Sequence, residues 1–445
     1  MRIIIAGAGA VGTHLAKLLS GESQDITLID ESPERLGSLD SNFDLLTIVA
    51  SPTSIRDLTE AEAGKADLFV AVTPDEGRNI VACQLAHMLG ASKTLARIDN
   101  YEFLTPKLRE YFASIGVDSL IYPEMLAAKD IVDGMRQSWI RQWWDFADGA
   151  LVMMGVKVRD NTEILDTPLY KLGNDRPYHI VAIVHDDETI IPNGNDVIHS
   201  GDIVYFMCGK NDIQAVRRVA GKQELPDIRD VIIMGGGRIA VRAAQLLSES
   251  VNVKIIEKDL ARCHHISEKL SSKIMVICGD GRDPNLLQSE GIDHTEAFIA
   301  LTDSAETNIL ACVAAKRLGV PKTIAEVENI DYITMAEKLD VGAVINKKKI
   351  TASHIYQMML DADVSNVKCL TFASAEVAEF VVRKGARVTK GTVRELSLPR
   401  GATIGGLIRG KEGMLVTGNT QFVEGDHVVV FCLDGMIRKL EKYFN

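Results

Sequence analysis

The chain carries one glycine-rich turn pattern twice, about half its length apart. A strand-like apolar run leads into Gly7–Gly12 (Gly-Ala-Gly-Ala-Val-Gly), and Asp30 closes the next apolar run. At the midpoint the same layout leads into Gly235–Ala240 (Gly-Gly-Gly-Arg-Ile-Ala), with Glu257 in the acidic position. Gly235 follows Gly7 by 228 residues and Glu257 follows Asp30 by 227, so the copies are in register. One such turn is weak evidence, but two in register predict a duplicated nucleotide-binding unit.

Composition narrows the class of protein. With 445 residues, 46% of them hydrophobic, the chain is long enough for three or four domains of ordinary size. Its net charge of −12 argues against a nucleic-acid partner, because neutralising phosphates requires a basic face. No apolar run approaches the ~18 residues of a membrane helix. The seven cysteines form no Cys-x-x-Cys pair, so we expect a cytoplasmic protein with no disulfide framework and no metal site.

Two segments alternate short β-rich runs with amphipathic helical stretches. Strands separated by helices require crossover connections, which are right-handed and produce a parallel sheet with helices on both faces. Residues 1–123 and 228–347 are therefore predicted to be Rossmann-like, doubly wound lobes. The fold class is α/β.

The remaining segments have a different period. Within 145–222 and 368–445, apolar residues recur mostly at every second position between Gly, Asn and Asp turns, and each segment ends in an amphipathic helix. This pattern predicts a small α+β lobe with antiparallel strands after each Rossmann-like lobe. Segments 124–144 and 348–367 are predicted crossover helices or linkers, the first helical over 124–137. The three tryptophans follow that helix, and we expect them to pack a domain junction.

Each residue of the first glycine-rich turn has an expected role. Gly7 permits the tight turn out of the strand, Gly9 lets the backbone approach a pyrophosphate, and Gly12 lets the helix pack on the strand. The helix that begins near Ala10 points its free N–H groups and positive dipole end at the phosphates. Asp30 accepts hydrogen bonds from ribose hydroxyls, and its charge repels a 2′-phosphate. NAD(H), or alternatively ATP or ADP, is therefore favoured over NADP(H).

Residues that close later strands extend the first site. Thr73 and Pro74 follow the fourth strand at the carboxyl edge, where ligands bind in open α/β sheets. Arg97 closes the fifth strand, where it either reaches the phosphates or forms a surface ion pair, and the sequence leaves both readings open. The predicted cofactor-binding residues of the first lobe are Gly7, Ala8, Gly9, Ala10, Val11, Gly12, Asp30, Thr73, Pro74 and Arg97.

The second site departs from the first at three positions. Ala240 replaces the third glycine, which the dinucleotide-binding fingerprint allows. Arg238 enters the turn, where its guanidinium is expected to clamp phosphates. Glu326 stands where the first lobe has Arg97 and is expected to repel a phosphate tail, so the sites should differ in affinity or ligand. The predicted residues of the second lobe are Gly235, Gly236, Gly237, Arg238, Ile239, Glu257, Asp280, Thr302 and Asp303.

The ordered duplication resembles the TrkA family, the cytoplasmic peripheral subunit of bacterial Trk potassium-uptake systems. The resemblance spans essentially the whole chain. Its residues are the two turns with Asp30 and Glu257, Thr73 through Asn79 with Ala96-Arg97, Thr302-Asp303 with Glu306 and Asn308, and the pairs Gly201-Asp202 and Gly425-Asp426. The family's Gly-Asp-x-Thr after the third strand survives in the second half as Gly279-Asp280-Gly281-Arg282. The first half reads Ala50-Ser51-Pro52-Thr53, which puts the adenine-side contacts of that site in doubt.

The resemblance implies a function and an assembly. TrkA-like proteins form a tetrameric ring beneath a membrane-embedded potassium-translocating subunit, peripheral on the inner face of the membrane. Nucleotides bound to the Rossmann-like lobes, NAD(H) or ATP and ADP, shift the ring between conformations that open or restrain the pore. Subunit pairing is expected around 124–137 and 348–360.

Three functions remain as alternatives. No catalytic constellation stands out, so the leading hypothesis is a regulatory, nucleotide-sensing subunit without enzymatic turnover. A soluble NAD-dependent oxidoreductase would pair one cofactor lobe with a sizeable catalytic domain, whereas the small lobes have only about 75–80 residues and repeat one another. A ligand-free scaffold whose lobes only oligomerise is the third.

Overall fold

The computed structural model describes most of the chain, in two compact units. Unit 1 comprises Met1–Leu126 and Lys347–Asp361, and unit 2 comprises Ala127–Asn346 and Ala362–Asn445. Among the described residues, no helix is long and apolar enough to cross a membrane. The described residues are 1–20, 24–37, 45–173, 175–186, 188–247, 249, 251–329, 331–359, 364–369, 375–433 and 435–444.

A six-stranded parallel sheet forms the centre of unit 1. Its strand order, β3-β2-β1-β4-β5-β6, is that of a doubly wound Rossmann sheet. Every described pair of neighbouring strands is parallel. The apolar run of β1 is buried because helices cover both faces of the sheet, as predicted for this lobe. The strands are β1 (Arg2–Ala6), β2 (Asp25–Asp30), β3 (Leu46–Val49), β4 (Leu68–Ala71), β5 (Thr94–Arg97) and β6 (Ser119–Ile121).

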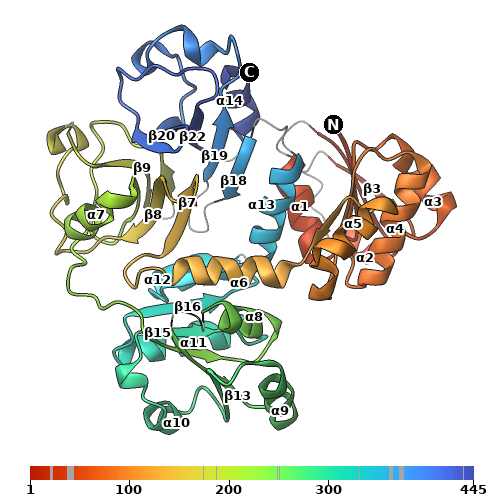
Figure 1. The fold of residues 1–445 in the computed structure, drawn as a ribbon, viewed down its shortest axis with the longest axis horizontal. Helices are drawn as coiled ribbons and strands as arrows, with labels where there is room; N and C mark the ends of the chain where they lie inside the picture. The colour runs from red at the N-terminus through yellow and green to blue at the C-terminus, as the bar shows by residue number, and fades with distance from the viewer. Residues whose placement is uncertain are drawn as a thin grey trace. The chain divides into compact units, whose positions relative to one another are not determined.

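Helices connect these strands and cover the sheet. α4 shows why they begin and end where they do: the Asp75 carboxylate accepts a hydrogen bond from the Arg78 N–H at its start, and Gly90 ends it with φ +118°. Figure 1 shows α1 on one side of the sheet and α3 and α4 on the other. The helices are α1 (Ala10–Ser20), α2 (Pro33–Gly37), α3 (Ile55–Glu60), α4 (Glu76–Leu89) and α5 (Pro106–Ser114).

Two crossover helices were predicted, and both exist. α13 (Lys347–Met359) belongs to unit 1, where it packs against α1 and buries Ala352, Ile355 and Tyr356. Residues 360–363 of the predicted segment lie outside the described residues. α6 (Pro123–Gly134) follows β6 directly and ends before Gln137, so the predicted end of this helix is wrong.

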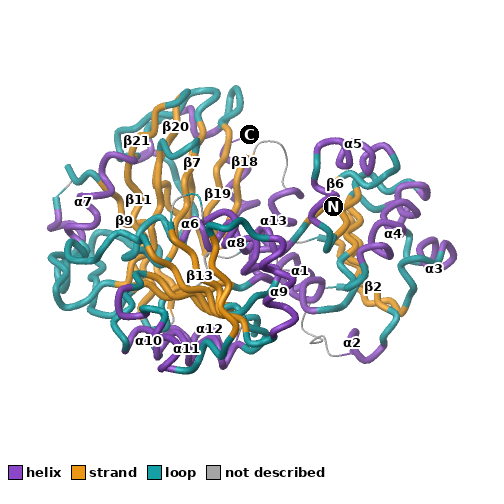
Figure 2. The backbone as a smooth tube through the Cα atoms, turned by 60° about the horizontal axis from the view of Figure 1, so that its bottom comes forward, coloured by secondary structure: helices purple, strands orange, loops and turns teal. Residues whose placement is uncertain are grey.

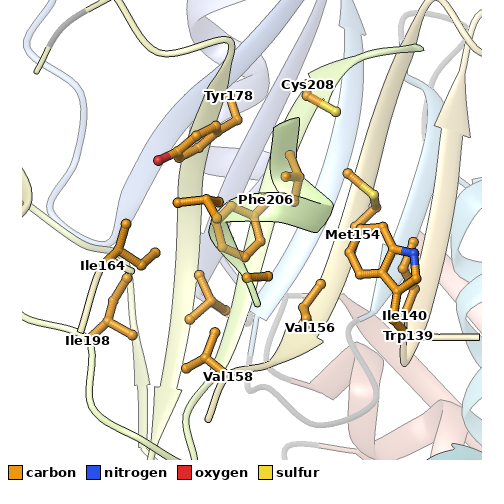
Figure 3. Packing of buried hydrophobic residues seen from close by; sticks show 14 of the residues in the cluster. Trp139, Ile140, Met154, Val156, Val158, Ile164, Tyr178, Ile198, Phe206 and Cys208 are labelled. Atoms are coloured by element: carbon orange, nitrogen blue, oxygen red, sulfur yellow. The ribbon is translucent and has the colours of Figure 1, made fainter. Parts of the chain in front are cut away.

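A five-stranded antiparallel sheet follows in unit 2, with the order β10-β9-β11-β8-β7. One face packs a core around Trp139, Met154, Tyr178 and Phe206, which Figure 3 shows. The elements are β7 (Gln142–Phe146), β8 (Leu151–Lys157), β9 (Tyr178–His185), β10 (Glu188–Ile190), β11 (Ile203–Gly209) and α7 (Ile213–Val219).

The second half of the chain repeats the doubly wound sheet, in the order β14-β13-β12-β15-β16-β17. Every described strand pair is again parallel. The strands are β12 (Asp230–Met234), β13 (Asn252–Glu257), β14 (Ile274–Cys278), β15 (Ala297–Ala300), β16 (Lys322–Glu326) and β17 (Ala343–Ile345). The helices are α8 (Arg238–Leu247), α9 (Leu260–Lys269), α10 (Pro284–Ser289), α11 (Ala305–Arg317) and α12 (Asp331–Lys338).

A second antiparallel sheet, β18-β19-β22-β20-β21, ends the chain. It shares a hydrophobic core with the first small sheet, in which Trp144 and Tyr205 pack with Val377 and Phe431. Figure 2 shows the strands of the two small sheets side by side. The elements are β18 (Val364–Cys369), β19 (Ala375–Val381), β20 (Ala402–Arg409), β21 (Glu412–Leu415), β22 (His427–Leu433) and α14 (Ile437–Phe444).

The predicted starts of both small lobes are too late. β7 spans the expected boundary between 144 and 145, and β18 spans the one between 367 and 368. β7 shows the physical reason, because Trp143 packs into the core of its own sheet and Trp144 into the core shared with the second small sheet. A strand buried on both faces loses the alternation of apolar and polar residues that reveals a strand in the sequence.

Candidate functional site

Both glycine-rich turns lie at the carboxyl edge of a parallel sheet, between its central strand and the following helix. Gly7 has φ +115° and Gly235 has φ +101°, a left-handed conformation that favours glycine. A Cβ added to Gly7 would lie 3.0 Å from the Thr73 nitrogen, and one added to Gly235 would lie 3.2 Å from the Thr302 nitrogen. The fold thus brings each turn against the predicted threonine at the end of the neighbouring strand.

The third position of the turn differs between the lobes for a packing reason. A Cβ on Gly12 would lie 1.9 Å from the Gly7 carbonyl oxygen, so no side chain fits there. Ala240 occupies the same position of the second turn, and its methyl group is fully buried. The first lobe therefore requires a glycine, whereas the second is built around an alanine.

The middle glycine of each turn is not required by the protein itself. Nothing lies within 4 Å of the position that a Cβ on Gly9 would take, and the nearest atom to one on Gly237 is the Leu301 oxygen at 3.9 Å. Neither residue has a positive φ. Space is left here in front of the N-terminus of α1 in unit 1 and of α8 in unit 2, where unpaired N–H groups attract anions.

The acidic residues hold the turns in shape. In unit 1 one oxygen of Asp30 accepts a hydrogen bond from the Ala8 N–H at 2.7 Å, and the other from the Ser32 N–H at 2.8 Å. Glu257 does the same in unit 2, accepting from the Gly236 N–H at 2.7 Å and the Asp259 N–H at 2.8 Å. Each carboxylate oxygen has a second lone pair, so a ribose hydroxyl can still bind. The sequence had indicated only the ribose role.

An arginine stands beside each acidic residue, and sequence reasoning missed it. Arg35 Nη1 lies 3.7 Å from an Asp30 oxygen, and Arg262 Nη1 lies 3.6 Å from a Glu257 oxygen. Both arginines follow their acidic residue by five positions, a repeated spacing that comparison of the two halves would have revealed. Each places a positive charge beside the carboxylate that is predicted to bind ribose.

A buried asparagine fastens the strand ends in each lobe. Asn79 Oδ1 accepts hydrogen bonds from the N–H and hydroxyl of Thr73, and Asn79 Nδ2 donates to the Thr73 carbonyl and to the Arg97 carbonyl. Asn308 repeats all four bonds with Thr302 and the residue at the end of β16. The carboxyl edges of both parallel sheets are therefore held by the same four hydrogen bonds.

Arg97 forms an ion pair in unit 1, one of its two predicted roles. Its Nη2 lies 3.2 Å from Asp99 Oδ1. Its Nε is buried without a hydrogen-bond partner. The ion pair alone therefore does not satisfy this side chain, which retains a donor at the carboxyl edge of the sheet.

The rim of the first site carries a polar network in place of the missing Gly-Asp. The Ser51 hydroxyl donates to Glu31 Oε1 at 2.6 Å, and Arg78 forms an ion pair with the same oxygen. The Arg78 hydrogen bond, more than that of Ser51, lowers the pKa of Glu31. In the second lobe Lys258 takes the place of Glu31, so a basic residue stands where the first rim has an acidic residue paired with Arg78.

A cleft of about 260 Å³ opens at the second site. It contains the predicted Glu257, Asp280, Thr302 and Asp303 together with the first three residues of the turn. Its lining residues are Met234, Gly235, Gly236, Gly237, Ile256, Glu257, Lys258, Arg262, Gly279, Asp280, Gly281, Arg282, Leu301, Thr302, Asp303, Ser304 and Thr307. Lys258 and Arg262 are members that the sequence did not indicate.

Of three residues that the sequence singled out in unit 2, two lie outside the lining of the cleft and one lines it. Arg238 begins α8, is exposed and does not line the cleft, and its role as a phosphate clamp stays a prediction. Glu326, which was expected to repel a phosphate tail, is buried and does not line the cleft. Asp280 lines the cleft but pairs with Arg282 at 2.6 Å, which lowers its pKa to about 2.

Comparison with known proteins identifies the domains. The TrkA-N domain matches residues 3–123 and 231–347, and the TrkA-C domain matches residues 153–221 and 377–445. These four matches coincide with the two parallel sheets and most of the two antiparallel sheets described above.

Full-length relatives and solved structures agree with this division. The Trk system potassium uptake protein TrkA of Haemophilus influenzae is 33% identical, with 100% of this chain and 98% of that protein covered. Its counterpart from Vibrio alginolyticus is also 33% identical, with 98% and 96% covered. The GsuK RCK domain has a TM-score of 0.60 at 16% identity over 100% of this chain and 94% of that chain. The GsuK channel bound to NAD has a TM-score of 0.60 at 17% identity over 100% and 78%. With both domains matched twice in alternation and relatives above 30% identity over the full length, the chain belongs to the TrkA family.

Proposed function

We propose that this chain is a cytoplasmic nucleotide-sensing subunit that regulates a membrane potassium-uptake protein. The observation that carries the proposal is the open space beside Gly9 and Gly237. The fold does not require a glycine at either position, and a pyrophosphate would fill the space. The full-length relatives are named Trk system potassium uptake proteins, which supplies the physiological context. The fold is shared with a channel solved with NAD and with ADP, so NAD(H), ATP and ADP are the ligands to consider.

The residues present fit a dinucleotide in a defined way. The pyrophosphate would lie against Gly9 or Gly237 at the N-terminus of the following helix, and Asp30 or Glu257 would accept the ribose hydroxyls. Arg97 offers an unsatisfied buried Nε at the edge of the first site. The remaining predicted residues, Pro74 and Thr73 in unit 1 and Thr302 and Asp303 in unit 2, would form the wall beside the turn.

The two sites are proposed to have different ligands or affinities. At the rim of the first site Glu31 is paired with Arg78, whereas Lys258 lines the second site in the place of Glu31. Arg35 and Arg262 are matched between the two sites, so Lys258 makes the difference. A more basic cleft favours a more highly charged phosphate chain, because each close cation adds a charge-assisted hydrogen bond. The second site is therefore the better candidate for ATP, and the first for NAD(H).

We expect a nucleotide bound in unit 1 to act through the contact between α1 and α13. α1 begins at the glycine-rich turn and packs against α13, which leads toward the second small lobe. His14 of α1 lies in this contact: its burial, followed by the charges of Lys349 and Lys17, lowers its pKa to about 4. A ligand shifts a conformational equilibrium only by its difference in affinity for the two states, so we expect it to change the packing of α1 on α13.

The assembly is part of the proposal. Four chains would form a ring that contacts the membrane protein, with α6 and α13 as the pairing helices. Because each chain holds two sites, eight modest preferences would add, and a total of ~5.5 kcal/mol suffices to move a two-state equilibrium from 1:99 to 99:1. Static light scattering of the purified full chain tests the tetramer directly.

Isothermal titration with NADH, NAD⁺, ATP and ADP tests ligand binding by the full chain. The matched variants Gly9→Ala and Gly237→Ala assign each ligand to a site, since each adds one methyl group to one turn. Potassium uptake in cells that depend on the co-expressed membrane protein then tests regulation. A folded chain that binds none of the four nucleotides would refute the proposal, as would robust hydride transfer to hydroxy or amino acids.

A further inference from the structure

A cavity of about 370 Å³ lies in unit 2, and its lining contains no residue of either glycine-rich turn. In the first small lobe its walls come from the segment before β7, the end of β8 and the segment after α7. In the second Rossmann-like lobe they come from the α11–β16 and α12–β17 connections. The volume is within the usual range for small-molecule sites. Neither the sequence patterns nor the matched domains assign it a role.

Basic side chains dominate the walls of this cavity. It is lined by one carboxylate, that of Asp340, and a second, that of Glu337, adjoins it. The six cationic lining residues are Arg141, Lys157, Arg159, Lys222, Lys316 and Lys322. A cluster with six cations and two carboxylates is unexpected in a chain whose net charge is −12.

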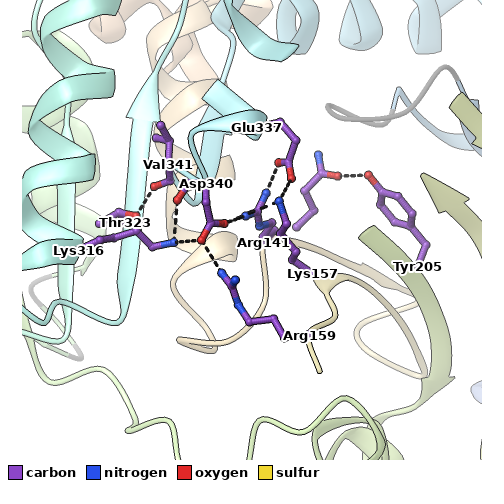
Figure 4. A network of polar contacts seen from close by, with 10 residues as sticks. Arg141, Lys157, Arg159, Tyr205, Lys316, Thr323, Glu337, Asp340 and Val341 are labelled. Carbon is purple, nitrogen blue, oxygen red and sulfur yellow. Dashed lines mark hydrogen bonds and ion pairs between the residues drawn. The ribbon is translucent and has the colours of Figure 1, made fainter. Parts of the chain in front are cut away.

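Four of the cations share the two carboxylates, as Figure 4 shows. Arg141 pairs with both Glu337 and Asp340, and Lys157 donates to Glu337 at 2.6 Å. Arg159 and Lys316 both reach the same Asp340 oxygen, Lys316 at 3.0 Å. These pairs hold the guanidinium and ammonium groups in place around the cavity, but two negative charges do not neutralise four positive ones.

The remaining two cations form no ion pair with the described residues, although the charge of Asp340 acts on Lys222 at longer range. The ammonium of Lys222 has neither a hydrogen bond nor an ion pair with any described residue, although the residue is only 9% exposed. Its burial lowers its pKa to about 8. Lys322 donates to the Ile140 carbonyl, and its complete burial lowers its pKa to about 7. A buried ammonium without a counter-ion is unfavourable, and an anion in the cavity would relieve this.

We propose that this cavity binds a polyphosphate group, either free or as the tail of a nucleotide. Arginine forks bind phosphate oxygens in pairs and lysines contribute point charges, so the wall offers the donors that such a chain requires. The excess of up to four positive charges matches the charge of a tri- or tetra-anion and exceeds that of a single carboxylate. Because the ligand would contact both lobes, it would stabilise the conformation in which the first small lobe and the second Rossmann-like lobe meet.

Titration of the full chain with inorganic tripolyphosphate at constant ionic strength tests the proposal. The Lys222→Met variant should bind about tenfold more weakly, since it removes one charge-assisted hydrogen bond. It should fold at least as stably as the wild type, because the ammonium it removes has no partner. Lys210→Met removes an exposed charge from the same lobe. It should bind tripolyphosphate within about twofold of the wild type, well below the tenfold step of 1.4 kcal/mol.

The outcomes separate the possible sources of the ligand. If Lys222→Met weakens the binding of both tripolyphosphate and ATP, the occupant of the cavity is the tail of a nucleotide. If it weakens the binding of tripolyphosphate alone, the occupant is a free polyphosphate. Equal binding by Lys222→Met and the wild type overturns the proposal. Loss of tripolyphosphate binding in Gly237→Ala also overturns it, because the anion would then sit at the glycine-rich turn. Nucleotide binding at the turns can succeed or fail independently of this result.

Discussion

Two substitutions three residues apart in the first turn should have opposite consequences. Gly12→Ala would place a Cβ 1.9 Å from the Gly7 carbonyl oxygen, whereas real Cβ contacts are essentially never under 3.0 Å. The backbone of the turn must open by about the 1.1 Å between these values, and overpacking of this kind costs typically 1–3 kcal/mol in a core that can adjust. Because the obstacle is backbone, we expect unit 1 to lose about 3 kcal/mol or more.

Gly9→Ala, by contrast, should leave the fold unchanged and weaken the binding of the ligand. No atom lies within 4 Å of its new methyl group and its φ is not positive, so the free energy of unfolding should change by less than about 1 kcal/mol. The methyl group would occupy the place of the pyrophosphate, and the affinity for NADH should fall about tenfold or more, or ~1.4 kcal/mol.

The assay must report on unit 1 specifically. All three tryptophans lie in unit 2, so their fluorescence does not follow the first sheet. Hydrogen exchange of the β1 amides, combined with titration calorimetry, measures both effects. The reasoning is refuted if the β1 amides of the Gly12→Ala variant are as protected from exchange as those of the wild type. It is also refuted if Gly9→Ala lowers this protection as much as Gly12→Ala does. Ala240→Gly, the reverse change in the second lobe, is the matched control and should cost only about 1 kcal/mol for glycine in a helix.

Three further predictions concern other groups. Asp30→Ala leaves the buried Ala8 N–H without its acceptor, so it should destabilise unit 1 by about 1–3 kcal/mol and weaken the binding of NADH. Hydrogen exchange measures the first effect and calorimetry the second. Unchanged protection of the β1 amides would contradict the role of Asp30 in holding the turn. Asn308→Ala removes four hydrogen bonds and should destabilise the second Rossmann-like lobe by at least about 2 kcal/mol in urea unfolding, an effect that a surface residue would not produce. Lys322 has a folded pKa of about 7 against 10.5 for the ordinary group. Between these values the unfolded chain binds the extra proton, so stability should rise with pH by up to about 1.4 kcal/mol per unit. The Lys322→Met variant should lack this rise in the free energy of unfolding between pH 7 and 9.5. An identical dependence on pH in the variant and the wild type would exclude Lys322 as its source.

Local signals were sufficient for most of the architecture. The βα alternation and two turns in register predicted the two parallel sheets, because the period of apolar residues and the left-handed requirement at Gly7 and Gly235 are properties of short segments. The same signals failed at β7. Its two tryptophans pack into different cores, so no alternation marks the strand, and the predicted helix end and lobe boundary were both displaced.

In the site, too, some features follow from the local sequence, and others depend on contacts between distant segments. The sequence placed Asp30 and Glu257 at the ribose position, but only the structure shows that they also hold the turns, through bonds to residues more than 20 positions away. From their positions alone it predicted that Arg238 clamps phosphates and that Glu326 repels them, but neither residue lines the cleft.

The sequence by itself determined the duplicated fold and the position of each turn, because those follow from the order of residues along one strand and the helix after it. Only the tertiary structure decided which side chains meet. The cationic cavity joins residues from Arg141 to Asp340, almost 200 positions apart, and no local pattern records that Lys222 lacks a counter-ion there. Charge pairing depends on distances of a few ångströms between segments, and such distances exist only once the chain has folded.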